Sequence, residues 1–223
     1  MEALRKVLAA LFAIGARVEV RGLETLPPAD SGGFIMIANH NSRFDTPLVF
    51  STLRGYRLTG LAGDTYRSHT FFRWFLETTD IVWLNRGATG PSAIKAAVQA
   101  LRAGRVLGIA PEGKRSTTGG LIEGRTGVAF IARAAQARIV PVGVIGSERL
   151  ADSLRRLRRA PLTIVFGRPF TLPPREPGRR AEQLAEDTAE IMCRLAAILP
   201  PRYRGVYADH PRLAAILAES QPE

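Results

Sequence analysis

The stretch FIMIANHNSRFDTPLVFSTL, residues 34–53, decides the fold class of this 223-residue chain. Its first five residues are apolar and are typical of a buried strand, which Asn39 and His40 close. A helical pattern begins near Phe44, and Ser42 is placed to cap it. The stretch therefore predicts a strand that passes directly into a helix, which is the repeating unit of α/β folds.

The same alternation continues on both sides of this stretch. It predicts strands at 18–20, 58–62, 81–84, 106–110, 139–145 and 162–166, and helices at 92–103, 127–135 and 179–199. No internal repeat or long linker divides the chain. We expect one α/β domain over residues 18–202, a mixed β-sheet flanked by helices, followed by a C-terminal tail at 203–223.

The N-terminal segment, residues 1–17, is predicted to be an amphipathic helix. Leu4, Leu8, Leu11 and Phe12 follow the spacing of one helix face. Such a helix either packs on the core or lies in a membrane interface, and periodicity does not choose between the two. No segment approaches the roughly 20 apolar residues that a membrane-spanning helix needs.

The formal net charge of +11 is carried mostly by arginine. A basic surface attracts nucleic acid, anionic lipid headgroups and phosphorylated substrates alike. Few aromatic residues are interleaved with the basic ones, so nucleic acid is the least favoured partner. Arg155, Arg156, Arg158 and Arg159 are predicted to lie around a helix face, either contacting anionic lipid or only solvated.

His40 and Asp45 are the first candidates for chemistry. A neutral imidazole can take a proton from an alcohol, and a carboxylate on its other nitrogen would fix the tautomer and stabilise the cation that forms. The alternative is structural, because Ser42-x-x-Asp45 also resembles a capping box at the start of a helix. The spacing leaves both interpretations open.

The second candidate is a basic, glycine-rich segment after the strand at 106–110. It contains Glu112, Gly113, Lys114 and Arg115, and Arg86 ends another predicted strand. Glycine lets backbone amides approach an anion, and arginine grips phosphate oxygens with two donors. A phosphate site and a solvated basic loop both fit this composition.

Taken together, these segments resemble the 1-acyl-glycerol-3-phosphate acyltransferase family. Its N-H-x-x-x-x-D block is matched by Asn39-His40 and Asp45, and its F-P-E-G-T-R-S block by residues 110–116. A G-x-x-F-I-x-R block is matched loosely by residues 80–86, and a V-P-V strand by residues 139–144. The order of the four blocks also fits.

The resemblance implies an O-acyltransferase that makes phosphatidic acid. His40, oriented by Asp45, would deprotonate the hydroxyl of a lysophospholipid acceptor as it attacks an acyl-CoA or acyl-carrier-protein thioester. Arg86, Glu112, Gly113, Lys114 and Arg115 would bind the acceptor phosphate. No cofactor and no metal are implied. The lipid substrates favour a peripheral protein on the cytoplasmic face of an anionic membrane, with the helix at residues 1–17 lying in the membrane interface.

Three departures from the family blocks concern the acceptor. Asp80 and Trp83 replace the glycine and phenylalanine of the second block, and Lys114 replaces the threonine of the third. They leave another lysophospholipid or a glycolipid open as the acceptor. A non-catalytic lipid-binding protein, a hydrolase and a basic nucleic-acid-binding protein are the alternatives from other classes.

Overall fold

The computed structural model describes residues 2–63, 82–84, 91–174 and 180–219. The predicted site residue Arg86 lies outside these ranges, and so does Asp80.

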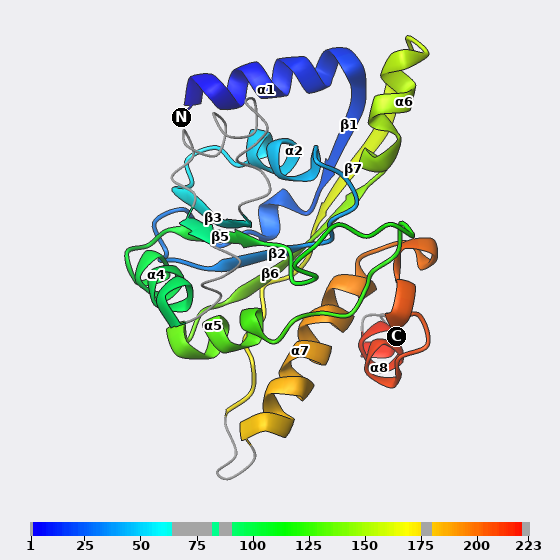
Figure 1. Ribbon diagram of the computed structural model, residues 1–223. Coiled ribbons are helices and arrows are strands. Elements are labelled where there is room, and N and C mark those ends of the chain that lie inside the picture. Colours follow the sequence, from blue (N-terminus) through cyan, green and yellow to red (C-terminus); the bar gives the residue numbers. More distant parts are fainter. Residues whose placement is uncertain (1, 64–81, 85–90, 175–179, 220–223) are drawn as a thin grey trace.

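A seven-stranded sheet with the order β1-β7-β6-β2-β5-β3-β4 forms the centre of the molecule (Figure 1). Neighbouring strands from β6 through β2, β5 and β3 to β4 pair in parallel. Strands β6 and β7 pair antiparallel. The sheet is therefore mixed, as predicted. The strands are β1 Ala16–Arg21, β2 Ile35–Ala38, β3 Leu58–Gly63, β4 Val82–Leu84, β5 Val106–Ile109, β6 Ile139–Ile145 and β7 Ala160–Phe166.

Helices cover both faces of the sheet (Figure 1). One face carries α1 Glu2–Gly15, α2 Asp45–Thr52 and α6 Leu150–Arg155, and the other carries α4 Pro91–Arg102, α5 Gly127–Ala135, α7 Arg180–Ala197 and α8 Pro211–Glu219. Short 3₁₀ turns lie at Leu23–Thr25, Ser147–Arg149, Pro201–Tyr203 and Gly205–Tyr207. The predicted fold class, a mixed sheet flanked by helices and preceded by a helix, is confirmed.

The sequence of the central strand β2 is apolar at every position because both faces of the strand are covered. Phe34 and Met36 belong to the core on the α1–α2 side, while Ile35 and Ile37 belong to the core on the α5–α7 side. Alternate side chains of a strand point to opposite faces, so a strand covered on both faces needs an unbroken apolar run.

Helix α1 both packs on the core and presents an apolar row outward. Leu8 and Phe12 are buried, whereas Val7, Leu11 and Ile14 are exposed. The helix ends at Gly15, two residues earlier than predicted, because Ala16 begins β1 and pairs with Ala160 of β7.

The prediction that four arginines surround a helix face is wrong. Helix α6 ends at Arg155, so Arg156 and Arg158 lie in the turn between α6 and β7, before Arg159 leads into the strand. Sequence spacing suited a helix, but Leu157 adopts a left-handed φ of +51° and the Arg158 N–H donates back to the Ser153 carbonyl, which ends the helix.

Four residues of the predicted C-terminal tail belong to the core on the α7 side. Tyr203, Tyr207, Leu213 and Ile216 are all buried in the same cluster as Ile191 of α7. In the part of the chain that the structure describes, no helix combines the length and apolar character that crossing a bilayer requires.

Candidate active site

Three neighbouring strands end at one edge of the sheet, and the predicted chemistry gathers there. His40 follows β2, Glu112 follows β5 and Ser147 follows β6, while β2 lies between the other two strands and parallel to both. The carboxyl ends of parallel strands are the usual ligand sites of α/β sheets. The strand order thus brings together residues that are 35 to 107 positions apart in sequence.

His40 and Asp45 are in contact. The distance from His40 Nδ1 to Asp45 Oδ2 is 2.9 Å, and the imidazole is half-buried while the carboxylate is 3% exposed. A carboxylate on Nδ1 favours the tautomer in which Nδ1 carries the proton, which makes Nε2 the basic nitrogen. The pair has the geometry of a general base and its orienting acid.

Asp45 also organises the turn that carries His40. The backbone N–H groups of Asn41 and Ser42 both donate to Asp45 Oδ2 at 2.8 Å, and the Ser147 hydroxyl donates to Oδ1. Helix α2 begins at Asp45 itself, and the Ser42 hydroxyl accepts only a 3.3 Å bond from the N–H of Phe44. The carboxylate therefore closes the turn and contacts His40 at the same time.

Glu112 fixes the backbone of His40 rather than pointing toward solvent. Its Oε1 accepts the His40 N–H at 2.9 Å, its Oε2 accepts the Ile122 N–H at 3.1 Å, and the side chain is 1% exposed. Burial raises the pKa of the Glu112 carboxyl above its usual value, and the two N–H donors offset part of this rise. On the other side of the same residue, the N–H of Ser116 donates to the His40 carbonyl at 2.7 Å.

Asn39 extends the pairing between β2 and β6. Its side-chain amide donates to the Val144 carbonyl at 2.8 Å and accepts the Val144 N–H at 2.7 Å. Backbone pairing of these strands ends at Ala38 and Val142, so the buried amide adds one further step to the ladder. Sequence reasoning did not assign this role to Asn39, and it missed Ser147, which carries no motif of its own.

The basic loop after β5 exposes its charged side chains and is held in place by a buried hydroxyl group. Lys114 and Arg115 are exposed, whereas the Ser116 hydroxyl is buried and donates to the Gly120 carbonyl at 2.6 Å. Gly113 has a φ of +68°, a left-handed conformation that favours glycine. A Cβ at Gly113 would lie 2.7 Å from Nε of Arg125. The guanidinium of Arg125, a second one besides that of Arg115, therefore lies against the Gly113 backbone.

The family of the chain follows from comparison with known proteins. A family model described as Acyltransferase matches residues 17–145, more than half of the chain, and this span includes both His40 and Glu112. The chain belongs to the acyltransferase family. This confirms the resemblance that the motifs carried and the prediction of an acyltransferase.

Two curated relatives of this chain are both named 1-acyl-sn-glycerol-3-phosphate acyltransferase. A 1-acyl-sn-glycerol-3-phosphate acyltransferase of Bacillus subtilis is 24% identical over 163 residues, covering 73% of this chain and 78% of the relative. One of Chlamydomonas reinhardtii is 27% identical over 194 residues, covering 85% of this chain and 55% of the relative.

A solved structure shares the fold. The crystal structure of the 1-acyl-sn-glycerophosphate (LPA) acyltransferase PlsC from Thermotoga maritima superimposes with a TM-score of 0.63 at 22% identity. The match covers 82% of this chain and 74% of that one.

The only cysteine of this acyltransferase, Cys193, is not a candidate for the chemistry. Cys193 is buried in α7, and burial raises the pKa of its thiol to about 11, which keeps it protonated and unreactive at neutral pH. Among the residues that the structure describes, no group of three or more histidine, cysteine or carboxylate side chains is arranged to hold a metal ion.

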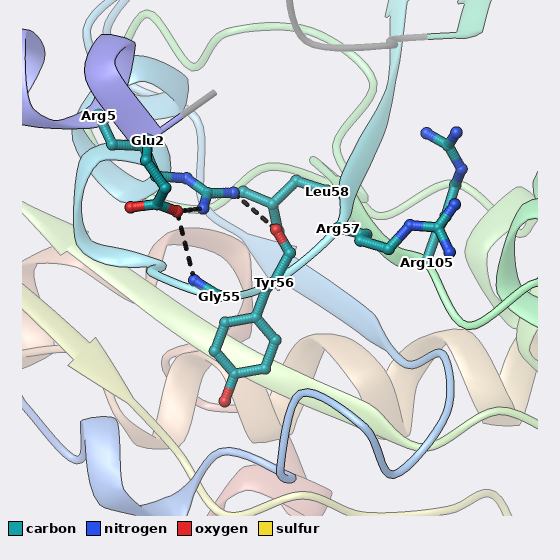
Figure 2. Close-up of a pocket in the computed structure, with 7 residues that line it drawn as sticks. All are labelled: Glu2, Arg5, Gly55, Tyr56, Arg57, Leu58 and Arg105. Carbon is teal, nitrogen blue, oxygen red and sulfur yellow. Dashed lines mark hydrogen bonds and ion pairs between the residues drawn. The ribbon is translucent and has the colours of Figure 1, made fainter.

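A separate pocket of about 310 Å³ lies at the start of the strands, on the edge opposite His40. Figure 2 shows that Arg5 of α1 contacts Glu2 and donates to the Tyr56 carbonyl at 2.6 Å. The Arg5 guanidinium also lies 5.0 Å from the ring centroid of Phe50. These contacts fasten the beginning of α1 to the domain, so the pocket is a structural junction rather than part of the active site.

Proposed function

We propose that this acyltransferase moves a fatty-acyl chain from an acyl-CoA or acyl-carrier-protein thioester to the hydroxyl of 1-acyl-glycerol-3-phosphate, giving phosphatidic acid. The observation that carries the proposal is the 2.9 Å contact between His40 Nδ1 and Asp45 Oδ2 at the edge where β2 and β5 end. The names of the two curated relatives support the choice of acceptor.

In the proposed mechanism His40 is the general base. Its Nδ1–H donates to Asp45, and Nε2 takes the acceptor's hydroxyl proton as the oxygen attacks the thioester carbonyl. Asp45 stabilises the imidazolium that forms. The tetrahedral intermediate then collapses to the ester, the carbon–sulfur bond breaks, and Nε2 returns the proton to the leaving thiolate.

The acceptor phosphate is proposed to bind at the loop after β5. Lys114 and Arg115 are exposed cations close in sequence to Glu112, which holds the His40 backbone. The Gly113 backbone and Arg86 complete the proposed set. Glu112, with both oxygens accepting backbone N–H groups, is assigned to positioning His40 instead of touching the phosphate. No cofactor takes part in these steps.

The test is an acyl-transfer assay with purified protein, a panel of lysophospholipid and glycolipid acceptors, and both donor types. We expect His40→Ala to abolish transfer while the protein stays folded. His210→Ala is the matched control, because His210 lies before α8, where its ring accepts the N–H of Arg212. Near-normal turnover by folded His40→Ala protein refutes the mechanism.

The same assay decides the finer parts of the proposal. Highest turnover with an acceptor other than 1-acyl-glycerol-3-phosphate would replace the acceptor but keep the mechanism. Release of free fatty acid without any acceptor would instead indicate a hydrolase. Arg115→Ala should chiefly raise KM for phosphate-bearing acceptors, and an unchanged KM would remove Arg115 from the phosphate site.

We also propose that the enzyme works as a peripheral protein on the cytoplasmic face of a membrane. Acceptor and product are lipids in the proposed reaction, so the active site has to meet a bilayer. The net charge of +11 favours an anionic surface. We expect no nucleic-acid partner. Proteins that bind single-stranded nucleic acid interleave basic with aromatic side chains, and this sequence has few aromatic residues among its basic ones.

A further inference from the structure

The turn between α6 and β7 presents a leucine to solvent in an unfavourable backbone conformation. Leu157 is 96% exposed, and its φ is +51°. A left-handed conformation costs a residue with a Cβ roughly 1–2 kcal/mol, whereas glycine adopts it readily. This side chain therefore gains nothing from burial within the protein to offset that cost.

The hydrogen bonds of the turn show that glycine is the expected residue at Leu157. The N–H of Arg158 donates to the Ser153 carbonyl at 2.8 Å, and the N–H of Leu157 donates to the Leu154 carbonyl at 3.0 Å. This pair of bonds defines a Schellman motif, in which the left-handed position is usually occupied by glycine. The backbone of the turn therefore gives no folding reason for a leucine at this position.

Leu157 continues an apolar surface that begins on α1. Leu154 is 45% exposed and lies against the end of α1, where a Cβ on Gly15 would come within 2.8 Å of its Cδ2. From there the exposed row Val7, Leu11 and Ile14 runs along α1 at a spacing of four and three residues. In Figure 1 the α6–β7 turn and α1 occupy the same end of the molecule. We call these five side chains the apolar rim.

Both ends of α1 are fastened, so the apolar rim is a rigid surface. At one end Arg5 is buried against Phe50 and the Tyr56 carbonyl. At the other end the guanidinium of Arg159 donates to the carbonyls of Ala13 and Ala16 at 2.6 and 2.7 Å. The turn that carries Leu157 is thereby tied directly to the end of α1.

Charged side chains surround this surface, and most of them are basic. Arg156 and Arg158 flank Leu157 and are exposed, as are Lys6 and Arg17 next to the apolar row of α1. The acidic neighbours are balanced, because Asp152 pairs with Arg155 and Glu2 pairs with Arg5. Aliphatic side chains ringed by cations fit the headgroup region of an anionic bilayer, where the apolar groups enter the acyl boundary and the cations meet the phosphates.

We propose that the apolar rim and its arginines form the surface by which this protein docks on an anionic lipid bilayer, with Leu157 as an inserted wedge. The proposal rests on the proposed function only in assuming that the enzyme meets its acceptor at a membrane. A second copy of the chain is the rival occupant of this surface. The positive charge opposes that pairing, because two copies would bring their arginines together.

Leu157→Gly separates docking from folding. The substitution relieves the left-handed strain, so the thermal midpoint should stay the same or rise. Removing a leucine side chain from the acyl boundary should weaken vesicle binding by roughly ten- to a hundredfold. The measurement is flotation with vesicles of phosphatidylglycerol and phosphatidylcholine, alongside Leu157→Asn, because asparagine also tolerates this conformation.

The matched control is Val206→Ala, which shortens an apolar side chain that is 62% exposed on the far side of the sheet, next to the buried Tyr207. Its vesicle binding should equal that of the unaltered protein. Equal binding by Leu157→Gly would overturn the proposal, and so would an equal loss in the Val206 control.

The contribution of the arginines to membrane binding is tested by removing their charge. The double variant Arg156→Gln/Arg158→Gln should lose roughly fivefold in binding per charge on anionic vesicles, and little on neutral ones. Replacing both by lysine should restore binding. Binding by the glutamine variant that is unchanged on anionic vesicles overturns the proposal. A dimer in the unaltered protein that Leu157→Gly dissociates overturns it in favour of a second copy.

Failure of this proposal is distinguishable from failure of the proposed function. Vesicle binding is measured without turnover, and His40→Ala protein should bind vesicles like the unaltered protein. Leu157→Gly should in turn keep full activity on a short-chain acceptor dissolved as monomers. Loss of that activity at normal vesicle binding would contradict the docking role.

Discussion

Replacing Asp45 by asparagine isolates the charge of the carboxylate from its geometry. Asparagine has the same shape, and its one oxygen can take the position of Oδ2, which accepts from His40, Asn41 and Ser42. Its NH₂ group then faces the Ser147 hydroxyl, which can accept a hydrogen bond as readily as it donates one. Every contact of the native side chain is kept, and only the negative charge is lost.

The expected loss of activity follows from the charge that His40 acquires. Opposite unit charges about 4 Å apart interact by about 4 kcal/mol at an effective dielectric constant of about 20. A transition state that carries between half and all of the imidazolium charge would lose about 2–4 kcal/mol, which corresponds to roughly a 30- to 1,000-fold lower kcat/KM.

The assay is steady-state transfer with Asp45→Asn and Asp45→Ala proteins whose thermal midpoints are measured in parallel. Alanine leaves the buried N–H groups of Asn41 and Ser42 without acceptors, so we expect it to cost stability as well as activity. A folded Asp45→Asn protein within threefold of normal kcat/KM would refute the reasoning. Asp45 would then be a helix-start residue whose charge plays no part in proton transfer.

Three further predictions concern buried groups. Asn39→Ala removes both hydrogen bonds to Val144 and should lower the free energy of unfolding by about 2–5 kcal/mol in denaturant titrations; a loss below about 0.5 kcal/mol would contradict the ladder role. The raised pKa of Glu112 favours folding at pH values below its unfolded pKa, and this contribution is lost as pH rises through the folded pKa. The stability of Glu112→Gln relative to the unaltered protein should therefore improve from about pH 4 to about pH 7, and a difference that is independent of pH would argue against it. Cys193, with a thiol pKa of about 11, should react with a thiol reagent at about pH 8 only after unfolding, and rapid modification of native protein would contradict its burial.

Local sequence patterns predicted the elements of this fold well. The strand at 139–145 and the helix at 127–135 match β6 and α5 residue for residue, because an unbroken apolar run and a period of about four residues are local signals. The turn after Arg155 was not predicted, since nothing in its composition indicates that a leucine adopts a left-handed conformation there. Residues that usually mark such a position are glycine and asparagine.

The candidate site was predictable only as two separate motifs. The spacing of His40 and Asp45 is local, and the structure brings them into contact. The bond from the His40 N–H to Glu112 spans 72 residues, and it exists because β5 is the neighbour of β2 in the sheet. Strand order is a property of the whole fold, so no reading of either motif alone gives this contact. Ser147 was missed for the same reason, since it reaches Asp45 from the end of β6.

The contacts of Glu112 separate two tasks within one loop. Its buried carboxylate and the Ser116 N–H hold the His40 backbone from both sides, so the position of the base depends on the inner residues of the loop. Lys114 and Arg115 lie on the outside of the same loop. A change at these exposed positions alters the charge of the loop without removing either of these two hydrogen bonds to the His40 backbone. If the loop binds the acceptor as proposed, the lysine that departs from the family block at position 114 changes which headgroup is chosen, while the geometry proposed for proton transfer stays the same.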